Sequence, residues 1–168
     1  TLLTTFRTPR SKWYQRNSVD FAFTAFTPEG HIVYMPTLLD SAFLYDRSGR
    51  LLKSKKMESV RTNKTTDFVF HVEDMFVDDQ FIYLLRVNHD STSEEVTCKK
   101  IDKYDFQFNH LESLMLPSPV TIGIELEPWA PWYHKFVVRN NTYYLVLSQP
   151  IEHLVAYEPA TPVQTEKH

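Results

Sequence analysis

Residues 26–54, FTPEGHIVYMPTLLDSAFLYDRSGRLLKS, decide the fold. Apolar and polar residues alternate in His31–Met35 and in Ala42–Tyr45, as they do in half-buried strands. The polar turn Pro28-Glu29-Gly30 precedes the first of these runs, and an amphipathic stretch at Gly49–Ser54 follows the second. Together with the strand that leads into residue 26, this stretch predicts four short antiparallel strands joined by hairpins.

Residues 76–116 and 136–161 repeat the same layout. Each unit has a polar turn, an apolar strand with a central Tyr, a loop, and a strand that ends in Tyr plus an acid. The turns are Pro28-Glu29-Gly30, Asp78-Asp79-Gln80 and Arg139-Asn140-Asn141, and the terminal pairs are Tyr45-Asp46, Tyr104-Asp105 and Tyr157-Glu158. The central residues Tyr34, Tyr83 and Tyr144 are 49 and 61 positions apart, within or somewhat beyond the roughly 40–50 residues of a propeller blade.

The chain as a whole reads as all-β. Twelve Phe, nine Tyr and three Trp make up 14% of the residues, and aromatic residues suit a pleated, half-buried surface. Helical periodicity is limited to a possible short turn around Asp105–Ser113. The predicted strands are Val19–Phe26, His31–Met35, Ala42–Tyr45, Phe68–Val72, Phe81–Val87, Lys135–Val138 and Tyr143–Leu147.

Two motifs carry a resemblance to known propellers. The first is Gly30-x-Ile32-x-Tyr34, followed after a loop by Leu44-Tyr45-Asp46-x-x-Gly49-x-Leu51-Leu52, and it resembles the six-bladed β-propeller families of the NHL and TolB-like type. The second unit, with Asp78-Asp79-x-x-Ile82-Tyr83 and Ile101-x-x-Tyr104-Asp105, is similar to bacterial six-bladed propeller lipoproteins. The resemblance covers residues 19–157 and implies an extracytoplasmic location, in the bacterial periplasm or at the cell surface. The chain departs from such families in having only three Gly.

We expect a single propeller segment with blade-like units of four antiparallel strands at about residues 13–57, 67–117 and 129–161. Residues 1–7, TLLTTFR, have the character of the outer strand of a preceding or closing blade. The third unit ends without a fourth strand. Propellers typically need 4 to 8 blades, so three units predict about half of a six-bladed ring.

A half ring would leave apolar blade faces uncovered at both ends. We expect a protein partner or further blades to cover these faces. The further blades would come from missing flanking sequence, which the start at Thr1 rather than Met favours, or from a second copy of the chain. A β fold other than a propeller is the remaining alternative.

Composition excludes several classes of protein. The chain has 168 residues, of which 42% are hydrophobic, too many for a disordered chain. The net charge of −3 argues against nucleic-acid binding, and no apolar run is long enough for a membrane span. The single cysteine, Cys98, cannot form an internal disulfide or a zinc cage of several thiolates. We predict no cofactor.

The segment ELEPWAPWYH, residues 125–134, is the main candidate for ligand binding. Its aromatic rings lie between two prolines that restrict the backbone, so they could form a rigid platform for a carbohydrate or a peptide. The candidate ligand-binding residues are Trp129, Trp132, Tyr133 and His134. The alternative is that these rings wedge between adjacent blades.

Two other polar clusters in the sequence are interpreted as structural rather than functional. His71, Asp74, Asp78 and Asp79 could be proposed as metal ligands, but the first alternates along a strand and the last two belong to a turn. The basic run Lys53, Lys55, Lys56, Arg61 and Lys64 is interpreted as a solvated connector between blades. No catalytic residue and no metal site is predicted.

Two function classes remain. The first is a non-catalytic propeller module that acts as a scaffold or binds a ligand or protein. The alternative is a propeller-type hydrolase or lyase whose active site, at the mouth of the channel, is completed by missing blades. The predicted inner strands carry no acid or His at equivalent positions, which favours binding over catalysis.

Overall fold

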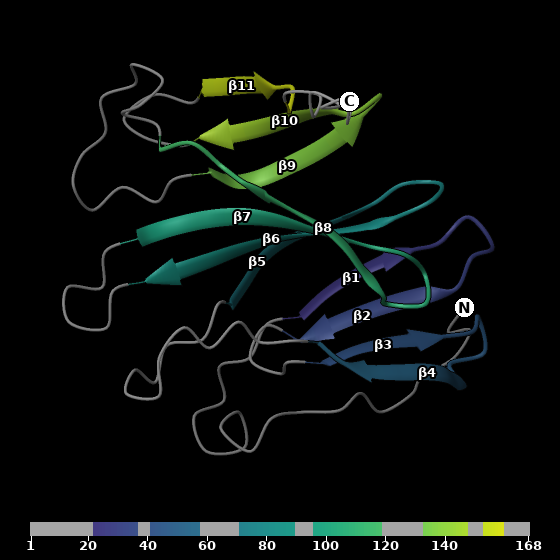
Figure 1. Cartoon of the computed structure of the whole chain (residues 1–168). Helices are drawn as coiled ribbons and strands as arrows, with labels where there is room; N and C mark the ends of the chain where they lie inside the picture. The colour runs from purple at the N-terminus through teal and green to yellow at the C-terminus, as the bar shows by residue number, and fades with distance from the viewer. Residues whose placement is uncertain are drawn as a thin grey trace, which may run out of the picture.

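The computed structural model describes residues 22–36, 41–57, 71–89, 96–118, 133–147 and 153–159. Within these residues the protein is all-β, with eleven strands in three antiparallel sheets and no helix (Figure 1). No described segment is a helix long and apolar enough to cross a membrane.

Each sheet follows the chain in order. The first sheet is formed by β1 (Ala22–Phe26), β2 (Ile32–Pro36), β3 (Ser41–Tyr45) and β4 (Leu51–Lys56). The second sheet is formed by β5 (His71–Val77), β6 (Ile82–His89), β7 (Val96–Tyr104) and β8 (His110–Met115). The third sheet has three described strands, β9 (Tyr133–Arg139), β10 (Thr142–Leu147) and β11 (His153–Tyr157), with β10 in the middle. These are blade-like units.

The acid after each terminal Tyr explains why the Tyr-acid pair recurs. Asp46 Oδ1 accepts hydrogen bonds from the backbone N–H groups of Ser48 and Arg50, at 2.9 and 3.0 Å, and so closes the turn between β3 and β4. Asp105 Oδ1 does the same between β7 and β8, accepting from the backbone N–H groups of Gln107 and Asn109 at 2.8 and 2.7 Å. A short carboxylate beside a turn supplies the acceptors that the turn backbone needs.

The three sheets stack through two hydrophobic cores, and the second sheet lies in the middle (Figure 1). Side chains alternate along β6, so Ile82 and Leu84 join the first core while Tyr83 and Leu85 join the second. The first core packs the second sheet against Val33 and the other buried residues of the first sheet. The middle sheet is therefore apolar on both faces, as a stacked blade requires.

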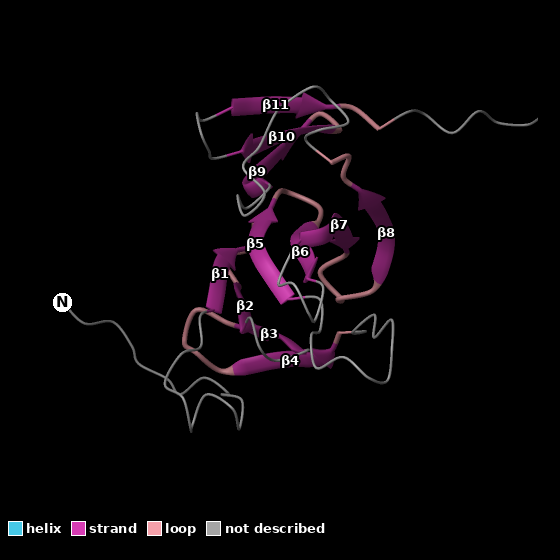
Figure 2. Ribbon diagram, turned by 90° about the vertical axis from the view of Figure 1, so that its left-hand side faces the viewer, coloured by secondary structure: helices cyan, strands magenta, loops and turns pink. Residues whose placement is uncertain are grey.

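The first strand of each sheet faces the first strand of the next. β1 contacts β5, and β5 contacts β9. Figure 2 shows these three strands one after another, with β4 and β8 toward the outside. The polypeptide thus enters each sheet at the side where β1, β5 and β9 lie next to one another. It leaves the first two sheets at the opposite side, at β4 and β8.

The third sheet has a face that no other described strand covers, and on it apolar side chains lie beside Lys135 and Arg139 of β9. On this face Leu154 of β11 is 71% exposed and Val137 of β9 is 49% exposed. Tyr144 and Val146 of β10 lie between them, because Tyr144 pairs with Val137 and Val146 pairs with Leu154. The opposite face of the same sheet forms the second core through residues such as Tyr143 and Leu145.

Most predicted strands and turns are confirmed, and one prediction is wrong. The third strand of each unit ends at Tyr45, Tyr104 and Tyr157, as expected. Of the strand predicted at Phe68–Val72, residues 68–70 lie outside the described residues, and the described part belongs to β5, which continues to Val77. The predicted helical turn at Asp105–Ser113 is a hairpin turn followed by β8, because Asp105 satisfies the turn backbone and lets the chain reverse. Residues 1–7 lie outside the described residues, and the boundaries of the units stay a prediction.

Candidate functional site

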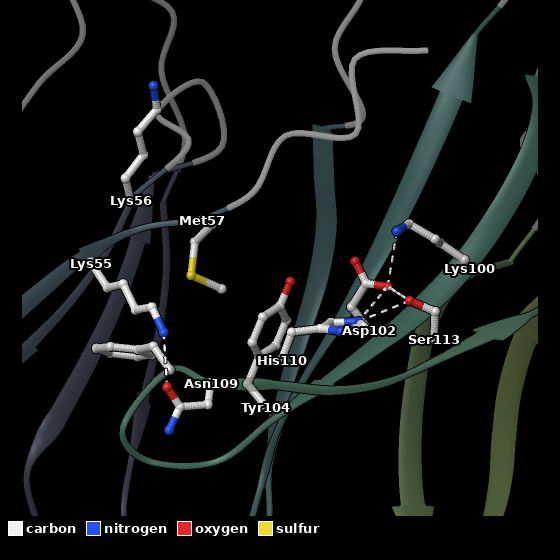
Figure 3. Close-up of a pocket in the computed structure, with 10 residues that line it drawn as sticks. Lys55, Lys56, Met57, Lys100, Asp102, Tyr104, Asn109, His110 and Ser113 are labelled. Carbon is white, nitrogen blue, oxygen red and sulfur yellow. Dashed lines mark hydrogen bonds and ion pairs between the residues drawn. The ribbon is translucent and has the colours of Figure 1, made fainter.

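A cavity of about 410 Å³ opens between the first and second sheets. Strand β4 supplies one wall with Lys55 and Lys56, and Met57 follows directly after that strand. Strands β7 and β8 and the turn between them supply the other wall, which includes Lys100, Asp102 and His110 (Figure 3). The volume is within the range of small-molecule sites, roughly 300–1,000 Å³.

Asp102 is the centre of a polar cluster at the wall of the cavity. Its carboxylate lies 2.9 Å from Lys100 Nζ and 3.1 Å from Arg86 Nε, and the side chains of Arg86 and Asp102 are each 3% exposed. The Arg86 Nε–H has no hydrogen-bond partner among the described residues, so its contact with Asp102 is an ion pair without hydrogen-bond alignment. A second nitrogen, Arg86 Nη2, donates to the Tyr104 hydroxyl at 3.4 Å.

Strand alternation places these charges together. Arg86 follows Ile82 and Leu84 on the same face of β6, and Asp102 lies on that face of the neighbouring strand β7. Arg86 pairs in register with Lys100, and Leu84 pairs with Asp102. The face of the second sheet that packs into the first core therefore carries charged residues at one end, and the cavity begins there.

Ser113 and His110 complete the cluster, but they do not form a nucleophilic site. The Ser113 hydroxyl donates to Asp102 Oδ1 at 2.6 Å, and His110 Nε2 lies 2.9 Å from Ser113 Oγ. Because the only hydroxyl proton points to the carboxylate, His110 Nε2 must donate to Ser113 rather than accept its proton. In a catalytic triad the histidine accepts the serine proton and contacts the acid through its other nitrogen. This arrangement therefore suits binding better than nucleophilic attack.

Polar contacts also tie the first sheet to the β7–β8 turn. Lys53 Nζ donates to Gln107 Oε1 at 2.6 Å, and Lys55 Nζ donates to Asn109 Oδ1 at 2.9 Å. Between these two residues, Phe108 adopts a left-handed conformation with φ of 60° and is buried in the first core. For a non-glycine residue that conformation costs roughly 1–2 kcal/mol, which burial of the ring offsets. The basic residues of β4 thus belong to a strand rather than to the predicted solvated connector.

A second polar cluster joins the second and third sheets. Lys99 of β7 lies 2.5 Å from a Glu73 carboxylate oxygen and also donates to the backbone oxygen of Tyr133. Burial lowers the pKa of the Lys99 ammonium group, and the negative charge of Glu73 opposes this effect. On β5, Asp74 accepts hydrogen bonds from Lys135 Nζ at 2.9 Å and from the Phe136 backbone N–H at 3.2 Å. These contacts fasten β9 to the middle sheet.

The predicted ligand platform is only partly described. Trp129 and Trp132 lie outside the described residues, so the platform stays a prediction. Tyr133 begins β9, and its ring is fully buried in the second core. Burial raises the pKa of its phenol, whose oxygen has no hydrogen-bond partner among the described residues. His134 is half-buried on the same strand.

Asp78 is one of the four residues that the sequence groups as possible metal ligands, and it belongs to a turn. Asp78 closes the β5–β6 turn by accepting hydrogen bonds from the backbone of Gln80 and Phe81, as predicted. Its other oxygen accepts from the Tyr83 hydroxyl, and burial together with this bond raises the pKa of that phenol. In the part of the chain that the structure describes, no three His, Cys, Asp or Glu side chains are grouped to hold a metal ion.

Sequence reasoning missed the cluster around Asp102. A charged residue in an alternating strand is normally assigned to the solvent face, and Lys99-Lys100 reads as an exposed basic pair. One signal was present, since Arg86 and Asp102 occupy positions that continue the apolar alternation of β6 and β7. Comparison of the chain with protein-family models, curated proteins and solved structures found no match.

Proposed function

We propose that this chain is a non-catalytic binding or scaffold module built from three blades of a β-propeller. One observation carries the proposal. The three blade-like sheets stack face to face with their first strands side by side, and the last sheet presents an apolar face. Such a face is the kind of surface that the next blade covers in a propeller.

The chemistry of the charged groups supports binding rather than catalysis. Asp74, on the first strand of the middle sheet, is engaged by Lys135 and by the Phe136 backbone. Ser113 directs its proton to Asp102, which is held by Arg86 and Lys100 in ion pairs. Both carboxylates thus act as anchors between or within sheets.

The partner that we propose is another blade-like β-sheet, which covers the face formed by Val137, Tyr144, Val146 and Leu154. It is supplied by further polypeptide of the same protein or by a second copy of this chain. An extracytoplasmic location in a bacterial envelope is part of the proposal and rests on the resemblance of the second unit alone. Fractionation of the source cells tests that location.

Sedimentation velocity of the purified chain tests the partner surface. The unmodified chain should self-associate at micromolar concentration, and Leu154→Asp should shift it to the monomer by placing a charge on the apolar face. Leu111→Asp is the matched control, because Leu111 lies on β8 and is also exposed, at 49%. Equal effects of the two variants on self-association would contradict the proposed surface, and a monomeric unmodified chain would contradict its being covered by a second copy.

A further inference from the structure

We propose that the cavity between the first and second sheets binds the phosphate group of a small organic molecule whose apolar body lies against Met57, Tyr104 and Phe108. This proposal is independent of the partner surface on the third sheet. It rests on the charged residues at the wall of the cavity and on the ion pairs and hydrogen bonds that these residues already make.

The lining of the cavity has an excess of positive charge. Among the described residues, the lining includes Lys55, Lys56 and Lys100 and one carboxylate, Asp102. Both oxygens of Asp102 are already engaged, by Lys100 and Ser113 on one side and by Arg86 on the other. Asp102 therefore serves two cations, and no other described lining residue supplies a negative charge to Lys55 and Lys56.

One further acid lies near Lys55 and adds a negative charge close to the cavity. Asp105 is within electrostatic reach of Lys55, and this contributes to the lowered pKa of its carboxyl group. The carboxylate of Asp105 is nevertheless held in the β7–β8 turn by the backbone N–H groups of Gln107 and Asn109 and by the Asn109 amide. The described lining residues and Asp105 together still carry more positive than negative charge.

The cations approach the cavity from opposite walls. Lys55 extends from β4 to Asn109, while Lys100 lies on β7 beside Asp102, and the Tyr104 ring stands between them (Figure 3). Lys56 lies at the rim, with its ammonium group directed away from Asp102. An anion in the cavity would meet Lys55 at the β4 wall, with Lys100 at the far side of Tyr104 and Asp102 (Figure 3).

The positive charge of the lining favours phosphate over carboxylate. A phosphate monoester carries about −1.5 to −2 charges at pH 7 and three acceptor oxygens, and lysine is a common phosphate binder. The one arginine in the cluster, Arg86, is buried behind Asp102 and does not line the cavity. The apolar side chains at the base of the cavity, Met57 and Phe108, belong to the first core and are 2% and 1% exposed, so an apolar body would meet only their edges.

Titration of the full chain with phenylphosphonate and with benzoate, at constant ionic strength, tests the proposal by calorimetry. The two probes share a ring and differ in the anionic group. We expect phenylphosphonate to bind saturably and benzoate to bind at least about ten-fold more weakly, the difference that a charge-assisted hydrogen bond makes. Absence of saturable phenylphosphonate binding, or equal binding of benzoate, would overturn the assignment.

Two lysine variants locate the site. Lys55→Met should weaken phenylphosphonate binding by about ten-fold or more, because it removes a positive charge that lines the cavity from β4. Lys53→Met is the matched control, since Lys53 lies on the same strand and bonds the same turn but does not line the cavity. Thermal unfolding shows whether each variant is folded. Equal weakening by both folded variants would show a general charge effect and would also overturn the proposal.

Discussion

Lys99 carries its ammonium group into the core between the second and third sheets, where its side chain is 0% exposed. It is held there by the Glu73 carboxylate at 2.5 Å and by the backbone oxygen of Tyr133. Burial of a charge is unfavourable unless the charge is paired and hydrogen-bonded, and both conditions are met. The hydrogen bond to Tyr133 therefore ties β7 to β9, and Glu73 of β5 neutralises the ammonium group that makes it.

Glu73→Gln should lower the free energy of unfolding by about 2 kcal/mol, because it leaves a buried ammonium group without its counter-charge. The value is below the usual range for buried pairs, since the Glu73 side chain is 20% exposed. Urea unfolding measures the change. Arg50→Gln is the control, because its pair with Asp46 is at the surface, with Arg50 75% exposed, and should change stability by under about 0.5 kcal/mol. Equal effects of the two variants would contradict this role of Glu73.

The sequence predicts individual residues well where the backbone sets their role. Asp78 is predicted in a turn and lies there, and the acids predicted at the ends of the third strands, Asp46 and Asp105, begin turns, because a short carboxylate satisfies turn N–H groups locally. Arg86 and Asp102 were not expected at a site. Their partner contacts run across strands, and such contacts depend on register, which a single alternating segment does not reveal.

Hairpins are the elements that set the register of each sheet. The turn between β9 and β10 consists of two residues, Asn140 and Asn141, with φ of 51° and 61°. Two consecutive residues in the left-handed region are typical of the tight hairpin turn whose twist matches the flanking strands. Asn tolerates this region better than most residues, which explains the Asn-Asn pair.

Replacement of Asn141 tests this turn. Asn141→Ala should destabilise the protein by about 1 kcal/mol, because alanine is strained at positive φ. Asn141→Gly should be at least as stable as the unmodified chain, because glycine adopts this region without strain. Thermal unfolding of the two variants measures the difference, and each serves as the control for the other because the position is exposed. Equal stability of the two would contradict the assigned turn.

Strand assignment from sequence succeeded where turn residues bounded an alternating run. Ala42–Tyr45 and Tyr143–Leu147 match β3 and β10 closely. The strand predicted to end at Val72 continues to Val77, because Glu73 and Asp74 interrupt the apolar pattern and suggest an early end. These two acids lie inside β5, where lysines of other strands neutralise them.

At the scale of the whole molecule, three blade-like sheets form a stack with the second sheet in the middle (Figure 1). The repeat predicted this arrangement, because a sheet with two apolar faces needs a neighbour on each side. Repetition alone did not predict the cavity between the first two sheets. That cavity depends on the length and charge of side chains such as Lys55 and Lys100, which a periodic pattern does not specify.

The central claim is that the apolar face of the third sheet docks on another β-sheet. Alkylation of a cysteine placed at Leu154 tests this claim most directly, in a chain that also carries Cys98→Ser. The account predicts that the cysteine of Leu154→Cys reacts slowly at high protein concentration and quickly after dilution, whereas that of Leu111→Cys reacts quickly at both. Equal, fast reaction of the two cysteines at every concentration would contradict it.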